Sequence, residues 1–472
     1  MRLADLKKIP LVLGERTTRN LLFALFIAAA SFFFGKAIVD LNIRLAVITA
    51  LIFTLGVFCL RIQTGVLALL IYLPFMAFLR RYIYIYNPYV RFDPILIISS
   101  ILTIFMFLYL IFFYSDTIIG PRRKKPIVRY TTLLLIIYAI EMFNPLQEGL
   151  SVGISGAIFF LIPTIWFYFG RFIDRERMNY ILYITVFIGV VVAMYGLKQN
   201  FLGYTSFEKY WAELGGYTAL SIRGWLRPVS TFASSQEYTT YIMIAGIISF
   251  ALVVKDVKNL PLLAVLALIV LALIMSASRG ALLGLIMGIG LYTILGLKET
   301  KRIGIAVLIM FIVYAGLVAR INFSSVNPDS AEAAYLAHTA SGIFDPFAKG
   351  STLWSHWSGA LRGFSLMFRN PIGYGLGAGT LAATKFGGIG TASEGFIASL
   401  QGSTGLVGTV VFFVLFFFLA RNSLLKYRRD GDFFSKLVFV ITIEVFLTID
   451  LRLYSIGPLI WLLWGYQSYR SS

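Results

Sequence analysis

Residues 260–295, LPLLAVLALIVLALIMSASRGALLGLIMGIGLYTIL, decide the fold class, because Arg279 is the only charged residue in this long apolar run. One straight helix of that length would be about 54 Å long, whereas the hydrocarbon core of a bilayer is about 30 Å thick. An arginine at the centre of a bilayer costs roughly 3 kcal/mol or more. The run therefore predicts a helical hairpin whose tight turn, SASRG at 276–280, places Arg279 at the outer membrane–water boundary.

The rest of the chain has the same apolar character. Of its 472 residues 59% are hydrophobic and only 13% are charged. Apolar runs of about twenty residues recur along almost the whole length, which is typical of a helical protein that crosses the membrane many times. We expect an all-α, polytopic transmembrane helix bundle of about 14 spans. The predicted spans are 20–34, 43–60, 62–79, 94–114, 129–143, 150–169, 178–197, 236–254, 260–276, 280–296, 302–319, 403–420, 436–450 and 453–468.

The basic residues predict the orientation of these spans. The net charge is +19, and Lys and Arg gather in the segments RRKKPIVR, GRFIDRER, VKDVK, LKETKR and RNSLLKYRRDGDFFSK. Cytoplasmic loops carry such an excess, and an even number of spans then places both termini in the cytoplasm. No clear cleavage site follows the basic segment 1–20, so we expect a retained first helix. With the charge in these loops we expect no nucleic-acid partner, and the single cysteine, Cys59, leaves no internal disulfide.

Spans and longer loops divide the chain into five parts. They are N-terminal spans (1–200), a first outer loop (201–235), spans that carry the Arg279 turn (236–319), a large outer loop (320–402) and C-terminal spans (403–472). In the large loop, apolar spacing predicts helices over 329–341 and 351–369, and the Asn-Pro pair at 370–371 ends the second one. An ordered outer loop of this length is where we expect the function.

The large outer loop holds the rarest titratable groups of the chain. Both histidines, His338 and His356, lie in it, and His356 shares the predicted helix 351–369 with Arg362 and small residues that indicate close packing. Glu394 stands shortly before an apolar span, where a desolvated carboxylate is suited to proton abstraction. Simpler interpretations stay open: the histidines as hydrogen-bonded structural residues, and Glu394 as part of a helix cap.

The segment GYGLGAG at 373–379, which contains Tyr374, resembles a dinucleotide-binding glycine loop only superficially. It follows a predicted helix and a proline rather than a strand, and it lies on the expected outer face. We reject that interpretation. The glycines instead permit a tight turn, which is either a purely structural turn or one whose backbone N–H groups meet a substrate or a neighbouring helix.

Two arginines are candidates for binding an anion. WLRPVSTFAS at 225–234 places Arg227 just before a proline and a predicted span, so Arg227 and Arg279 both belong at the outer surface. Arginine can hold a diphosphate without a metal because its planar fork makes bidentate hydrogen bonds. The outer loops contain no closely spaced carboxylate pair of the kind that holds a metal–diphosphate, so we expect no metal and no cofactor. The alternative is an arginine that extends to lipid headgroups.

Three acidic residues lie inside or at the ends of predicted spans, where such residues are rare. They are Glu237, Glu444 and Asp450. Each could pair with one of the arginines, and the sequence leaves open which one does.

Three segments in this order resemble the O-antigen ligase and O-antigen polymerase superfamily (the Wzy/WaaL type). The first two are RPVSTFASSQEYTTYIM at 227–243 and SASRGALLGLIMG at 276–288. The third is a long outer loop that ends in NPIGYGLGAGT and then TASEGFIASLQGSTGLVGTVVFF. The similar order covers roughly residues 220–420, while the first 200 residues match only as generic spans.

The resemblance implies a metal-independent, inverting glycosyltransferase with its site on the outer face of a bacterial cell (inner) membrane. The donor would be a glycan on undecaprenyl diphosphate. The acceptor would be another lipid-linked glycan in a polymerase, or a lipid A core in a ligase. Arg227 and Arg279 match the two positions that would hold the donor diphosphate. Where many ligases carry a His-Asn pair this chain has Glu394 instead, which favours a polymerase of secreted or capsular polysaccharide.

We therefore expect Arg227 and Arg279 to bind the diphosphate, with Arg362 assisting. Glu394 is the expected base, and His356 is the second choice. Further candidates are His338, Glu237 and Tyr374. Expected partners are the lipid-linked donor, the glycan acceptor, the lipid bilayer, and the chain-length regulator and flippase of the same pathway.

Two alternatives to a polymerase stay open. One is an O-antigen ligase. The other is a lipid-linked oligosaccharide flippase, which also has about fourteen spans but should carry its arginines within the spans and show two related halves. The chain shows no internal repeat and its candidate residues gather in outer loops, so an enzyme is favoured. A non-catalytic scaffold of an export complex would leave the two matched arginines without a role.

Overall fold

The computed structural model describes residues 15–86, 94–119, 126–215, 221–222, 225–255, 260–296, 352–380, 383, 386, 388 and 395–470. Regular structure in these residues is helical except for one short antiparallel ladder. In it Ser221–Ile222 (β1) pairs with Trp225–Leu226 (β2). The predicted helical class is confirmed.

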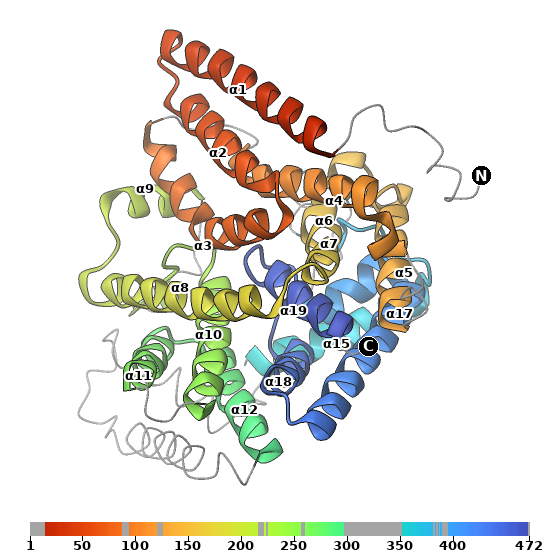
Figure 1. Cartoon of the computed structure of the whole chain (residues 1–472). Coiled ribbons are helices and arrows are strands. Elements are labelled where there is room, and N and C mark those ends of the chain that lie inside the picture. The colour runs from red at the N-terminus through yellow and green to blue at the C-terminus, as the bar shows by residue number, and fades with distance from the viewer. Residues whose placement is uncertain are drawn as a thin grey trace.

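Figure 1 shows the described helices, coloured in their order along the chain. Those before the ladder are α1 (Glu15–Val39), α2 (Ile43–Cys59), α3 (Ile62–Tyr86), α4 (Ile95–Ile119), α5 (Pro126–Glu141), the 3-10 turn η3 (Pro145–Gln147), α6 (Leu150–Phe159), α7 (Leu161–Gly170), α8 (Arg175–Leu202) and α9 (Ser206–Gly215). Those after it are α10 (Ser235–Lys255), α11 (Leu260–Met275), α12 (Arg279–Leu295), α15 (Thr352–Arg369), α17 (Phe396–Asp430), α18 (Phe433–Leu447) and α19 (Ile456–Arg470).

Seven helices of the described chain are long and apolar enough to cross a membrane. They lie at Asn20–Val39, Ile62–Tyr86, Ile95–Tyr114, Leu150–Gly170, Arg175–Leu202, Ser235–Lys255 and Phe396–Asp430. Shorter apolar helices occur at Ile43–Cys59, Pro261–Met275 and Arg279–Leu295. By length and composition the chain is a helical membrane protein. The number of fourteen spans and their orientation stay predictions, and the predicted span 302–319 lies outside the described residues.

The hairpin predicted for residues 260–295 is present. Helix α11 ends at Met275 and α12 begins at Arg279. The turn between them contains Ala277, whose φ of 55° is uncommon for a residue other than glycine. A second prediction, the helix over 351–369, is also confirmed as α15.

Several predicted spans have other ends in the structure. Helix α3 continues to Tyr86, past the predicted end at 79, and α17 extends beyond both ends of the predicted span 403–420. Helix α8 continues to Leu202, past the predicted end at 197, because the polar residues there pack against the following loop rather than facing lipid. The span predicted over 150–169 matches the candidate span Leu150–Gly170, within which Phe160 separates α6 from α7.

Glycines permit a close contact between helices α7 and α19 in the core. A Cβ atom added at Gly465 would lie 1.9 Å from the Phe167 carbonyl oxygen, and one at Gly170 would lie 2.1 Å from the Leu462 carbonyl oxygen. Small residues allow helix backbones to approach in this way, and in lipid such packing replaces the hydrophobic effect as the main attraction.

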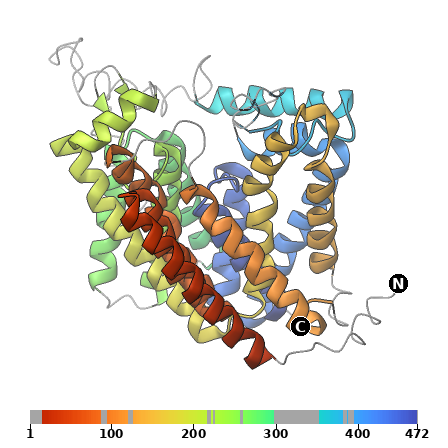
Figure 2. The ribbon, with the colours of Figure 1, turned by 90° about the horizontal axis from the view of Figure 1, so that it is seen from above.

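The two ends of the bundle differ. Figure 2 shows that α1 begins and α19 ends at the same end of the bundle. At the opposite end lie α9 and α15, with α15 lying across the other helices. We call this second end the loop end. Helix α10 is almost wholly buried, whereas α1 is mostly exposed, so the segments that enter α10 are held inside the protein.

Candidate functional site

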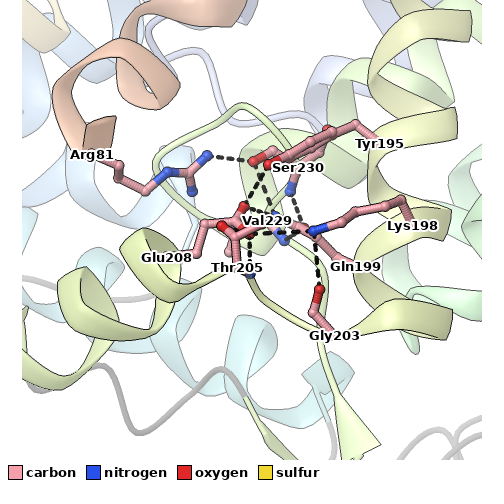
Figure 3. Close-up of polar contacts among 9 residues, drawn as sticks. All are labelled: Arg81, Tyr195, Lys198, Gln199, Gly203, Thr205, Glu208, Val229 and Ser230. Atoms are coloured by element: carbon pink, nitrogen blue, oxygen red, sulfur yellow. Dashed lines mark hydrogen bonds and ion pairs between the residues drawn. The ribbon is translucent and has the colours of Figure 1, made fainter. Parts of the chain in front are cut away.

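The segment from Arg227 to Ser234, which we call the strap, joins β2 to α10. Its backbone lies inside the bundle, where each polar group needs a partner. Gln199 of α8 supplies one: its Oε1 accepts hydrogen bonds from the N–H groups of Val229 (3.1 Å) and Ser230 (2.7 Å). One buried amide thus fixes two consecutive peptide groups of the strap (Figure 3).

Arg81 of α3 binds the strap through its carbonyl groups. Its Nη1 donates to the Phe232 carbonyl (3.0 Å), and its Nη2 donates to the Ser230 carbonyl. The guanidinium also lies 5.5 Å from the centre of the Trp211 ring. Arginine suits this role because its planar fork can reach two acceptors at once. Arg81 is fully buried, so its contacts serve the fold rather than a solvent-exposed ligand.

The charge that accompanies Arg81 is the buried carboxylate of Glu208 (Figure 3). Thr205 precedes α9 and donates to Glu208 Oε2 from both its N–H and its hydroxyl, at 2.8 Å each. This is a variant of the capping box, in which Thr and Glu stand three residues apart. The Tyr195 hydroxyl donates to Oε1 (3.0 Å), Gln199 Nε2 donates to the same oxygen, and Lys198 Nζ lies 3.8 Å from Oε2.

The strap also docks on α3 through Thr231. The Thr231 hydroxyl donates to the Pro74 carbonyl (2.7 Å), and the Thr231 carbonyl accepts from the Phe78 N–H (2.9 Å). A proline within a helix removes one hydrogen bond and weakens the turn around it. That lost bond is the one to the carbonyl four residues earlier, whereas Thr231 binds the Pro74 carbonyl and the Phe78 N–H, an acceptor and a donor four residues apart. The strap therefore docks on the turn of α3 that starts at Pro74.

Arg227 stands at the start of the strap. The Tyr204 hydroxyl donates to its carbonyl (2.8 Å), which fixes the backbone. Its guanidinium is half-buried, and Nε is buried without a hydrogen-bond partner among the described residues. Burial, and after it the nearby charge of Arg279, lowers the pKa of Arg227 below the ordinary value of arginine. The two arginines are therefore within electrostatic range of each other.

Arg279 reaches this position from a different element. It is the first residue of α12, after the N-cap residue Ser278. The Ser278 hydroxyl donates to the Thr239 hydroxyl (3.2 Å), which itself donates to the Ser235 carbonyl (2.9 Å) in the first turn of α10. The first turns of α10, which the strap enters, therefore hold the residue that precedes Arg279. The helix dipole disfavours a positively charged side chain at a helix N-terminus. A bound anion there is favoured by the dipole and by the guanidinium of Arg279.

The acidic residues that the sequence left without assigned partners have other partners than these two arginines. Glu237 accepts from the N–H and the hydroxyl of one serine, Glu444 accepts from a threonine hydroxyl, and Asp450 pairs with a different arginine. The partners are Ser455 for Glu237 (3.0 and 2.8 Å), Thr448 for Glu444 (2.8 Å) and Arg452 for Asp450 (2.6 Å). These three carboxylates therefore do not form an ion pair with Arg227.

The glycine turn at 373–379 uses its backbone N–H groups within the protein. Three of them donate to backbone carbonyls: Tyr374 N–H to Gly402 (3.0 Å), Gly375 N–H to Ser403 (3.2 Å) and Leu376 N–H to Glu141 (3.0 Å). Two donate to side chains: Gly377 N–H to Gln147 Oε1 (3.1 Å) and Gly379 N–H to Ser403 Oγ (3.2 Å). Of the two roles predicted for these groups, contact with neighbouring helices is the one that the structure contains. The turn fixes the start of α17 against η3 and α6.

The remaining candidates are spread more widely. Glu394 and His338 lie outside the described residues. His356 belongs to α15, but its side chain is outside what the structure describes. Arg362 is exposed on α15, and Tyr374 is half-buried in the glycine turn. The structure thus brings together Arg227 and Arg279 and does not place the predicted base.

Sequence reasoning missed the residues that hold the strap. Arg80 and Arg81 directly follow the predicted span 62–79, and an arginine pair at that position was a signal of a polar contact near the membrane boundary. TSFE at 205–208 has the spacing of a capping box. Gln199 had no such signal, since an amide at a span end is common.

Within the described residues no group of three or more His, Cys, Asp or Glu side chains converges in a way that could hold a metal ion. A scan against models of known protein families finds none that matches this chain, and a search of curated proteins finds no similar sequence.

Proposed function

We propose that this protein is a metal-independent, inverting glycosyltransferase that polymerises undecaprenyl-diphosphate-linked repeat units into polysaccharide. We further propose that it works on the outer face of a bacterial cell membrane, with about 14 spans and both termini in the cytoplasm. The observation that supports this most is that Arg227 and Arg279, which come from separate elements, lie within electrostatic range of each other.

Two like charges that are partly removed from water repel each other and lose hydration. An anion that carries at least two negative charges would offset both costs. A diphosphate has that charge, and its oxygens match the planar fork of arginine. The N-terminus of α12, which begins at Arg279, adds a partial positive charge on the same side.

The proposed reaction needs few protein groups. The acceptor hydroxyl oxygen attacks the anomeric carbon on the face opposite the diphosphate, which inverts the configuration. The bond between that carbon and the diphosphate oxygen breaks, and its electron pair leaves with the diphosphate, whose growing charge Arg227 and Arg279 stabilise. A base takes the hydroxyl proton.

Glu394 remains the proposed base and His356 the second choice. In the sequence Glu394 immediately precedes Gly395, the N-cap residue of α17. Glu237 is a weaker choice, because its Oε1 already accepts two hydrogen bonds in a buried position.

The proposal is tested with purified protein, a lipid-diphosphate-linked repeat unit and EDTA, and with the products separated on a gel. We expect a ladder of longer lipid-linked glycans, and we expect Arg279→Ala and Arg227→Ala to lose it at unchanged protein level. Full polymer synthesis by either variant would overturn the assigned role of that arginine.

The same assay separates the alternatives. Transfer of the glycan to an added lipid A core, without a ladder, would identify a ligase. Movement of the intact lipid across proteoliposome membranes, without any new glycosidic bond, would identify a flippase. Activity that requires an added divalent ion would contradict the metal-independent mechanism.

A further inference from the structure

Helix α15 carries a row of exposed large apolar side chains on one face. Their spacing of three and four residues places them on a single side of the helix. They are Trp354, Trp357, Leu361, Phe364 and Phe368, with exposed fractions of 39%, 59%, 54%, 52% and 56%. We call this row the aromatic stripe.

The side of α15 opposite the aromatic stripe packs on the bundle. Gly359 and Met367 are buried. A Cβ atom added at Gly363 would lie 2.9 Å from the Ala398 Cα atom of α17. The predicted packing of small residues on membrane helices is therefore confirmed at Gly363, and it fixes which way the stripe faces: away from the protein.

A third side of α15 is polar. Arg362, Ser365 and Arg369 are exposed and lie on one face at the same three- and four-residue spacing. This face is turned by about 100° from the aromatic stripe, because successive residues of a helix are about 100° apart. Helix α15 thus presents separate sides to protein, to a polar medium and to an apolar medium.

The position of α15 in the fold indicates which apolar medium the aromatic stripe contacts. Ala398, on which it packs, lies in the first turn of α17, in the part of the candidate span Phe396–Asp430 that precedes the kink at Gly405. Helix α15 therefore packs beside the N-terminal segment of a candidate span, and it lies across the loop end of the bundle (Figure 2). The medium that borders a span at its end is the boundary between headgroups and acyl chains.

We propose that α15 is an interfacial helix whose aromatic stripe inserts into the headgroup–acyl boundary of the bilayer. Tryptophan and phenylalanine favour this region. Arg362 and Arg369 then face the headgroup phosphates and water. This proposal does not depend on the proposed function, but it has a consequence for it: α15 contacts α12, so the anchored helix fixes the depth of the element that carries Arg279.

Spin labels on single cysteines test this inference in the full chain reconstituted in phospholipid vesicles. Cys59 is buried and is replaced by alanine in the background. Labels are placed on the stripe at Leu361→Cys and Phe364→Cys, with Arg362→Cys and Ser365→Cys as matched controls on the polar face of the same turns. The measurement is the collision rate of each label with oxygen, which concentrates in lipid, and with a water-soluble nickel chelate.

We expect the ratio of oxygen to nickel collision rates to be several-fold higher at the two stripe positions than at the two polar positions. Equal ratios, with strong nickel collisions at all four, would place the stripe in water and overturn the proposal. Low rates of both collisions at the stripe would mean that protein, such as a second copy, covers it, and would overturn it too.

A second measurement is tryptophan fluorescence, for which the only substitutions in the stripe are from tryptophan to phenylalanine. Fluorescence of the wild type and of the variant Trp354→Phe with Trp357→Phe is compared in vesicles of brominated phospholipid. We expect bromine near the headgroup end of the acyl chain to quench the difference signal at least twofold more than bromine near the chain terminus. No quenching of that signal by either lipid would contradict the proposal.

Discussion

Arg81 is the residue whose replacement should loosen the strap most. Arg81→Met keeps a long side chain but removes the donors to the Ser230 and Phe232 carbonyls. A buried carbonyl left without a donor costs about 1–3 kcal/mol. The variant also removes a positive charge that acts on the buried Glu208 carboxylate, and breaking a buried charge pair costs about 3–5 kcal/mol. Because these contributions overlap, we expect a loss of about 3–5 kcal/mol.

The assay is thermal unfolding of the purified protein in detergent, followed by the loss of the monodisperse peak. Since 1 kcal/mol shifts the Tm of a domain of 150–250 residues by about 2–4 °C, the variant should unfold several degrees lower. Glu208→Gln removes the negative charge but keeps a hydrogen-bonding side chain, and it should lose less stability than Arg81→Met. Lys209→Ala, an exposed neighbour, is the control and should stay within about 0.5 kcal/mol of the wild type.

Two results would refute this reasoning. If Arg81→Met unfolds at the wild-type temperature, the guanidinium does not hold the strap. If Arg81→Lys is as stable as the wild type, a single positive charge is enough, and binding two carbonyl groups at once does not contribute to stability.

Two further predictions concern backbone contacts near the site. Thr231→Val removes one buried hydrogen bond of 2.7 Å and should lower the free energy of unfolding by about 1–2 kcal/mol. Thr131→Val is the control and should be close to neutral, because the Thr131 hydroxyl bonds a carbonyl of its own helix. Equal effects of the two variants would contradict the docking role of Thr231. Gly377→Ala places a Cβ atom 2.1 Å from the Val152 carbonyl oxygen and should sharply reduce folded protein on size-exclusion chromatography. Gly280→Ala, with no atom within 4 Å, should not.

Much of the fold follows from local sequence. Apolar runs longer than a bilayer is thick predict helices and hairpins, and the charge of Arg279 predicts where the hairpin turns. The helix over 351–369 follows from its spacing and from the Asn-Pro pair after it. These features depend only on residues close together in the chain, so each can be worked out without knowing the rest of the fold.

The partners across the site could not be worked out in that way. Arg81 contacts Ser230, which is 149 residues away along the chain, and nothing local at either position specifies the other. The same is true of Glu237 and Ser455, which are 218 residues apart. Buried polar groups must be satisfied, but which group satisfies which is decided by how the helices pack.

The central claim is that Arg227 and Arg279 hold one diphosphate, and a binding cycle tests it most directly. The measurement is the affinity of the protein in detergent for undecaprenyl diphosphate, for the wild type, Arg227→Gln, Arg279→Gln and the double variant. Arg429→Gln, an exposed arginine at the far end of α17, is the control.

A charged hydrogen bond is worth about 1.5–3 kcal/mol, so each single variant should lower the affinity roughly 10- to 150-fold. The double variant should depart from the sum of the two losses by more than about 0.5 kcal/mol, because both side chains bind the same anion. Unchanged affinity in folded Arg227→Gln or Arg279→Gln protein would contradict the account.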